Sequence, residues 1–142
     1  IERVSEIENR LDKLLHDIIT QKEYVEFLIG RDGEFDLLAS AAIKRAVREY
    51  GYGNTYFTLV LPYMKAEYRG NEKEYLNYYD AVEVCEESSD AHPKAAIQIR
   101  NSNLVDRSDL IVCCIQRKSG GAYKTMQYAE KRGKCIINLA DN

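Results

Sequence analysis

The chain lacks tryptophan and long apolar segments, and its 142 residues include only two prolines and two histidines. No run approaches the roughly 20 apolar residues that cross a bilayer, and the charged, amphipathic start is unlike a signal peptide. A basic excess is also missing, because 20 Lys and Arg residues stand against 23 Asp and Glu residues. These absences argue against a membrane protein and make a nucleic-acid partner unexpected.

Metal-binding and redox patterns are absent as well. The four cysteines form no C-x-x-C pair, and His16 and His92 lie far apart in the sequence. We therefore expect no metal site and no cofactor, and we interpret the cysteines as reduced, buried thiols of a cytoplasmic protein.

The sequence does contain enough material for one domain spanning 1–142. Hydrophobic residues make up 45% and charged residues 30%, which is an ordinary balance for a globular domain. Apolar residues at three- and four-residue spacing predict helices, and β-rich runs predict strands. The expected helices are 1–18, 35–50, 93–107 and 121–132, and the expected strands are 24–29, 56–61, 80–85, 110–115 and 135–139.

This alternation predicts an α/β fold: a single Rossmann-like, three-layer domain with a mostly parallel sheet. The run 110–115 is the most apolar and is expected to be a central strand, whereas 80–85 is expected near an edge. The segment 64–78 is expected to be a loop with one or two helical turns. Such domains usually begin with a strand, so either a first strand is missing or the first helix covers the sheet alone.

Ligands of open α/β sheets bind beyond the carboxyl ends of the strands. The first candidate turn there contains Gly30, Arg31, Gly33, Glu34 and Asp36. Its glycines allow a close approach of the backbone to a ligand, and the following helix offers free amides to an anion. The alternative is that the glycines only turn the chain and that an aspartate caps the helix.

The second candidate turn contains Ser119, Gly120 and Gly121, with Thr125 one helical turn later. It combines flexible backbone donors, a hydroxyl group and a helix N-terminus, and Arg117 and Lys118 add positive charge. The spacing is neither that of a Walker A loop nor that of G-x-G-x-x-G. We favour an anion-binding role over a simple turn, because both glycine turns fall on the same edge of the sheet.

Arginine and tyrosine side chains supply two further candidates. Arg100 lies among apolar helix residues, and the residues alone favour a solvated position over one that points into the cleft. Of the eleven tyrosines, Tyr63 is the best placed to stack on a base. The tyrosine cluster is alternatively a subunit interface or a cover for sheet edges. The apolar face of the first helix favours a homo-oligomer.

Five short motifs together resemble the SLOG superfamily, and more closely its bacterial group of YpsA-like proteins, which carry an uncharacterised domain numbered 1273. The resemblance runs from about Tyr24 to Leu139. It implies a Rossmann-like fold and a nucleotide-derived ligand, with Arg100 and Asn101 near phosphate or ribose. The motifs are Phe27-Leu28-Ile29-Gly30, Gly33-Glu34-Phe35-Asp36, Ile99-Arg100-Asn101, Ser108-Asp109-Leu110 and Ser119-Gly120-Gly121-Ala122.

The same superfamily includes the LOG phosphoribohydrolases, and the chain departs from their pattern. Asn101 stands where those enzymes have lysine, Ser119 replaces their proline, and their third glycine is absent. Their catalytic glutamate has no counterpart, because Met126 and Gln127 occupy that region and Glu130 comes one turn later. YpsA-like proteins also usually start with a strand that carries a Gly-His-Arg turn, which this chain does not contain.

Cleavage of an N-glycosidic bond needs a carboxylate near the ribose. Because that carboxylate is missing from its family position, we expect a nucleotide- or ADP-ribose-binding module for sensing or signalling, without turnover. One alternative is a nucleotide N-glycosidase or phosphoribohydrolase that uses Asp32, Glu34 or Asp36. The other is a protein-interaction module with a degenerate pocket.

Overall fold

The structure is a computed structural model and describes residues 1–141. Every expected helix and strand is present, with ends within a few residues of those predicted. The elements, in chain order, are α1 (Val4–Gln21), β1 (Val25–Ile29), α2 (Glu34–Tyr50), β2 (Thr55–Leu61), α3 (Ala66–Gly70), α4 (Glu72–Tyr78), β3 (Ala81–Val84), α5 (Pro93–Arg107), β4 (Leu110–Cys113), α6 (Gly121–Lys131) and β5 (Cys135–Asn138).

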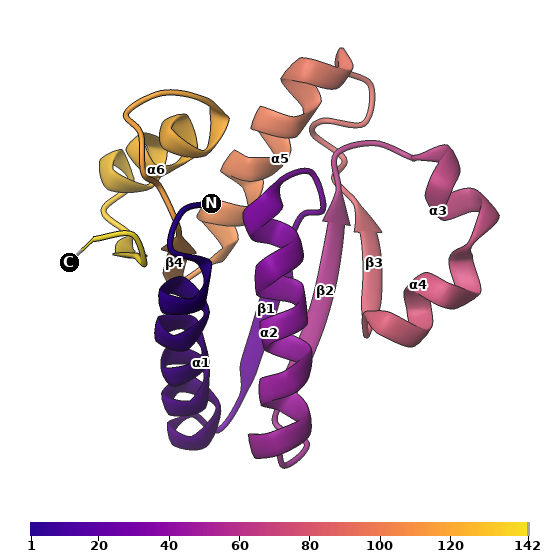
Figure 1. The fold of residues 1–142 in the computed structure, drawn as a ribbon. Helices are drawn as coiled ribbons and strands as arrows, with labels where there is room; N and C mark the ends of the chain where they lie inside the picture. The colour runs from indigo at the N-terminus through magenta and orange to yellow at the C-terminus, as the bar shows by residue number, and fades with distance from the viewer. Residues whose placement is uncertain (142) are drawn as a thin grey trace.

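The strands are parallel throughout and form two sheets, β1-β2-β3 and β4-β5. The chain moves from β1 outward to β3, and then crosses to β4 on the other side of β1 (Figure 1). Because parallel crossovers are right-handed, this reversal puts α5 and α6 on the opposite face from α1 and α2. The protein is therefore a Rossmann-like, three-layer α/β domain, and its strand order reverses between β1 and β4.

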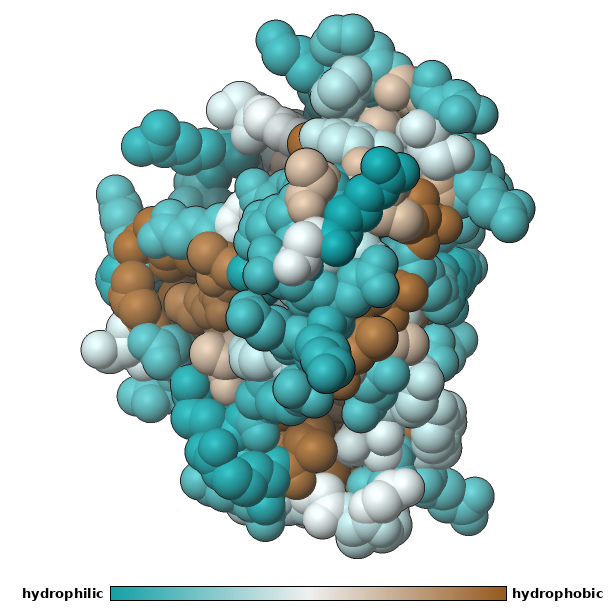
Figure 2. All heavy atoms as spheres, turned by 90° about the vertical axis from the view of Figure 1, so that its right-hand side faces the viewer, coloured by the Kyte–Doolittle hydropathy of each residue, from teal (hydrophilic) through white to brown (hydrophobic). Residues whose placement is uncertain are grey.

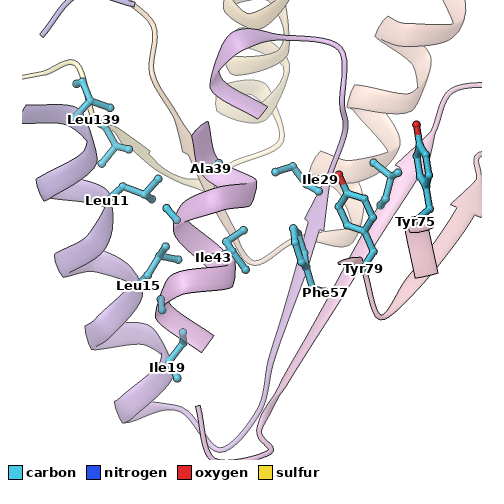
Figure 3. Close-up of a cluster of buried hydrophobic side chains, with 14 of the residues drawn as sticks. Leu11, Leu15, Ile19, Ile29, Ala39, Ile43, Phe57, Tyr75, Tyr79 and Leu139 are labelled. Atoms are coloured by element: carbon cyan, nitrogen blue, oxygen red, sulfur yellow. The ribbon is translucent and has the colours of Figure 1, made fainter. Parts of the chain in front are cut away.

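The main hydrophobic core lies between α1, α2 and the first sheet (Figure 3). Small residues on α2, such as Ala42 and Ala46, allow α1 to approach closely, and their side chains are buried. The apolar face of α1, which suggested a homo-oligomer, is buried in this core and needs no second copy to cover it. Its buried residues are Ile7, Leu11, Leu15 and Ile19.

The expectation that 110–115 forms the central, most buried strand is wrong. All four residues of β4 are partly exposed, and β4 pairs only with β5. Along a strand, the backbone N–H and C=O groups of successive residues point to alternate sides. Leu139 donates its amide to the carbonyl of Cys113, so the backbone groups of the preceding residue, Val112, point to the side of β4 away from β5. In β1, Val25 donates its amide toward the β2 side, to Asn54, so the backbone groups of Leu28 point away from β2. Among the described residues neither edge pairs with another strand, and the alternative that a first strand is missing stays a prediction.

The expected edge position of 80–85 is confirmed, because β3 pairs with β2 alone. The polar segment before it forms the short helices α3 and α4, which agrees with the expected helical turns. Tyr75 and Tyr79 are buried here, and the Tyr79 ring centroid lies 5.1 Å from that of Phe57. Figure 2 views this side of the molecule and shows separate hydrophobic areas within a mostly hydrophilic surface.

All four cysteines are free, but they are not uniformly buried. Cys85 is buried and Cys135 is exposed, so the expectation of buried thiols holds only in part. Burial raises the pKa of the Cys113 thiol to about 11, which keeps it protonated at neutral pH. Within residues 1–141, no helix is long and apolar enough to cross a membrane, and no group of three His, Cys, Asp or Glu residues is arranged to hold a metal ion.

Candidate functional site

The two glycine turns border one cleft at the carboxyl edge, where the strand order reverses. The cleft has a volume of about 410 Å³. Glu34 enters it from the turn after β1, and the segment between β4 and α6 forms the opposite wall. That wall includes Cys114, Arg117, Ser119, Ala122 and Tyr123. The sheet thus presents a concave site at its switch point, as is usual for ligand sites of open α/β sheets.

The start of α6 supplies backbone donors at the margin of this cleft. Gly120 is the N-cap residue with φ 93°, a left-handed conformation that favours glycine. No side chain caps the helix, so the amides of its first turn, at Gly121, Ala122 and Tyr123, have no intrahelical acceptor. Partial positive charge from these amides favours an anion at this end of the cleft.

Thr125 does not take part in this arrangement. Its hydroxyl donates to the carbonyl of Gly121 at 3.0 Å and accepts from the side-chain amide of Gln98 at 3.1 Å. The side chain therefore joins α6 to α5 and is absent from the cleft lining.

Arg100 is buried, so the expectation of a solvated position is wrong. Its side chain is 1% exposed, and its guanidinium donates to the carbonyl of Val60 and to Asp32, both at 2.8 Å. A third bond runs to Asn101 Oδ1 at 3.0 Å. Neither Arg100 nor Asn101 lines the cleft. In this structure Arg100 joins α5 to the end of β2 and to the first glycine turn.

This buried guanidinium explains why residue 30 is a glycine. A Cβ atom on Gly30 would lie 2.8 to 2.9 Å from the Cζ and Nη atoms of Arg100, closer than real Cβ atoms come. At Gly33 an added Cβ would meet no atom within 4 Å. Gly30 therefore permits the close approach of Arg100 to the turn, whereas Gly33 has no such packing role.

Asp32 links two cations across the same turn. Its carboxylate pairs with Arg100 on one side and with Lys65, just before α3, on the other. Burial of Asp32 opposes its ionisation, but hydrogen bonds from Lys65 and Arg100 outweigh this and hold its pKa below the ordinary value. The sequence interpretation missed Lys65, because nothing in the polar segment 64–78 distinguishes it from a solvated lysine.

The pKa of Asp36 shifts in the opposite direction to that of Asp32, although the two residues are hydrogen-bonded to each other. Asp36 accepts the backbone amide of Asp32 at 3.1 Å, and burial raises its pKa above the ordinary value. It stabilises the turn locally and does not line the cleft, but it is not the N-cap of α2, which is Gly33, and no side chain caps that helix.

These opposite shifts predict opposite effects of pH in two variants. Because the pKa of Asp36 is raised in the native state, this group contributes stability below about pH 4, and the contribution is lost as the pH rises. Asp36→Asn should therefore be more stable than the parent protein at pH 7. A lowered native pKa contributes stability above about pH 4 that is lost on acidification, so Asp32→Asn should be less stable at pH 7. In urea titrations from pH 7 to pH 3, both differences from the parent should shrink. Differences of the same sign would contradict this assignment.

Arg31 and Tyr63 lie on the α3–α4 side of the turn, outside the cleft lining. Arg31 donates to the hydroxyl of Tyr79 at 3.2 Å, and its Cζ atom lies 5.0 Å from the centroid of the Tyr75 ring. The Tyr63 ring lies 5.8 Å from the ammonium of Lys65. These contacts hold the α3–α4 segment against the first glycine turn.

The structure therefore brings together only part of the predicted set. Glu34 and Ser119 line the cleft, with Gly120 and Gly121 at the helix start beside it. The cleft also contains Tyr123, which the sequence interpretation missed although it stands two residues after Gly121. The amino group of Ile1 lies at the cleft as well, 2.9 Å from both carboxylate oxygens of Glu34.

Comparisons with known proteins add little to this picture. No family model and no curated protein matches the chain. A solved structure of (E)-4-hydroxy-3-methyl-but-2-enyl diphosphate reductase, the terminal enzyme of the non-mevalonate pathway, is similar at 13% sequence identity and a TM-score of 0.26. The match covers 93% of this chain and 52% of that chain, so this chain spans about half the length of that structure. A TM-score this low supports no inference about function.

Proposed function

We propose that the protein binds a nucleotide or an ADP-ribose derivative in the switch-point cleft and acts as a cytoplasmic sensing module without turnover. The carrying observation is the cleft itself, whose volume of about 410 Å³ lies within the 300–1,000 Å³ common for small-molecule sites. The N-terminal residues Ile1 and Glu2 also line the cleft, where Ile1 is hydrogen-bonded to Glu34 and Glu2 to Gln116.

The phosphate group binds at the start of α6 in this proposal. The uncapped amides there are backbone donors, and Arg117 lines the cleft without any charged partner among the described residues. The resemblance to the SLOG superfamily supports the same position at Gly120-Gly121. Because Arg100 occupies the space beside Gly30, the first turn contributes Glu34 to the cleft rather than a second phosphate site.

Hydrolysis of an N-glycosidic bond is the second candidate, and Glu34 is the observation that favours it. Its carboxylate lines the cleft, although it comes from a different turn from the glutamate of the LOG enzymes. Asp32 is less suited to that role, because Lys65 and Arg100 already hold its carboxylate. Glu130, on α6, is absent from the cleft lining.

The test is thermal unfolding with AMP, ADP-ribose, NAD, cyclic nucleotides and nucleoside monophosphates, with each mixture assayed for released base. A ligand at 100 times its Kd should stabilise the protein by about 2.7 kcal/mol. Gly121→Asp should abolish this stabilisation, because a carboxylate at the start of α6 repels phosphate. The variant should still fold, since an added Cβ atom has room there, with Gln98 Oε1 at 3.6 Å as its nearest neighbour. Gly70→Asp is the matched control, since an added Cβ there meets nothing within 4 Å and Gly70 is outside the cleft lining.

Stabilisation that Gly121→Asp removes and Gly70→Asp retains, with no released base, supports the binding module. Released base would identify a hydrolase and contradict the absence of turnover. Stabilisation by none of these compounds would contradict the proposal as a whole.

A further inference from the structure

The tyrosine rings near the carboxyl edge differ in what already covers them. Arg31 lies over the ring of Tyr75, and Lys65 lies near the ring of Tyr63. Tyr79 packs against Phe57 inside the core. These three aromatic faces are occupied by the protein's own side chains, which leaves little surface for a ligand.

Tyr123 is different, because it lines the cleft and its ring has no such partner. Within residues 1–141 no aromatic ring, lysine or arginine lies against it, and its hydroxyl makes no hydrogen bond to the protein. The side chain is half-buried, so its position is restrained by the start of α6 while part of it still faces the cleft. An aromatic face of this kind is a platform for a planar ring.

Glu34 lies on the other wall of the same cleft and is 68% exposed. Its two carboxylate oxygens accept from the amino group of Ile1, but each oxygen has a further lone pair for another donor. A carboxylate in the cleft is unfavourable for phosphate and favourable for hydroxyl groups, which donate hydrogen bonds to it. The cleft therefore combines an aromatic face with an acceptor for hydroxyls.

We infer that Tyr123 and Glu34 select a ribonucleoside phosphate, with the base stacked on Tyr123 and the ribose hydroxyls bonded to Glu34. This inference rests on the proposed function, because it assumes that the phosphate binds at the start of α6. It makes the base and the 2′-hydroxyl, rather than the phosphate alone, the groups that distinguish the ligand from other phosphate esters.

The test compares three probes by titration calorimetry: AMP, 2′-deoxyAMP and ribose 5-phosphate. Tyr123→Ala should weaken AMP binding about tenfold and leave ribose 5-phosphate unchanged, since only AMP carries a base to stack. Glu34→Gln should remove most of a roughly tenfold preference for AMP over 2′-deoxyAMP. Tyr128→Ala, on the same helix but bonded to Asp106 and outside the cleft lining, is the control and should change neither value.

A second measurement does not depend on a folded variant. Stacking on an aromatic ring should shift the adenine proton resonances of AMP upfield when the unsubstituted protein is added. Binding of AMP without that shift, or an equal loss of AMP and ribose 5-phosphate affinity in Tyr123→Ala, would overturn the inference while the proposed function stands. If the unsubstituted protein is stabilised by ADP-ribose or NAD but binds none of the three probes, the inference fails while the proposed function stands. Binding of none of these compounds would contradict both.

Discussion

Replacing Arg100 by methionine should lower the free energy of unfolding by about 3–5 kcal/mol, the usual cost of removing one partner of a buried ion pair. The guanidinium is 1% exposed and donates to the Val60 carbonyl, so its loss leaves a buried acceptor without a partner. Asp32 would keep only Lys65. The measurement is the urea unfolding of the parent protein and of Arg100→Met at pH 7, monitored by circular dichroism.

Arg107 provides the matched control for this prediction. It lies on the same helix and pairs with Glu83, but its side chain is 34% exposed. Exposed pairs contribute about 1 kcal/mol or less, so Arg107→Met should cost far less than Arg100→Met. Equal effects of the two substitutions would show that the buried network around Arg100 does not stabilise the fold.

Gly30→Ala should destabilise the protein by about 1–3 kcal/mol, as overpacking of a tight interior does. The added methyl would contact the Arg100 guanidinium at 2.8 Å, and the guanidinium cannot move away without breaking its bonds to Val60 and Asp32. Gly33→Ala is the control, because its methyl group meets open space and its backbone is extended. That variant should change stability much less than Gly30→Ala, since the restriction of the unfolded chain by alanine is opposed by the loss of glycine at the N-cap of α2. Differential scanning calorimetry measures both.

The double variant Gly30→Ala/Arg100→Met shows whether the destabilisation by Gly30→Ala comes from its contact with Arg100. Once Arg100 is methionine, the space beside residue 30 changes, so Gly30→Ala should cost less in that background than in the parent. Additive effects would separate Gly30 from Arg100 and contradict the account of this turn.

Most of the fold could be predicted from the sequence, because the periodicities are local and strong. Pro93, for example, fixes the start of α5, and His92 caps it by accepting the Lys94 amide. The position of β4 could not be predicted in this way. Its apolar composition is typical of a central strand, but composition does not determine which strands pair, and β4 pairs on one side only.

The candidate site could be predicted only in outline. The glycine turns revealed the correct edge of the sheet, since carboxyl ends of parallel strands lie together. The pairing of Asp32 with Lys65 and Arg100 joins residues distant in the sequence, and no local pattern indicates it. The same limit explains why Arg100 was expected in solvent and why Tyr63 was preferred to Tyr123. Which aromatic ring is left uncovered depends on tertiary contacts.

The most direct test of the central claim is an amide-resolved NMR titration of the protein with AMP and, separately, with ADP-ribose. At least one of them should shift the amide resonances of Gly120, Gly121, Ala122 and Tyr123 in a saturable way, while those of Arg31 and Tyr63 should change little. Saturable shifts confined to Arg31 and Tyr63, or no saturable shift with either ligand, would contradict a nucleotide site in the switch-point cleft.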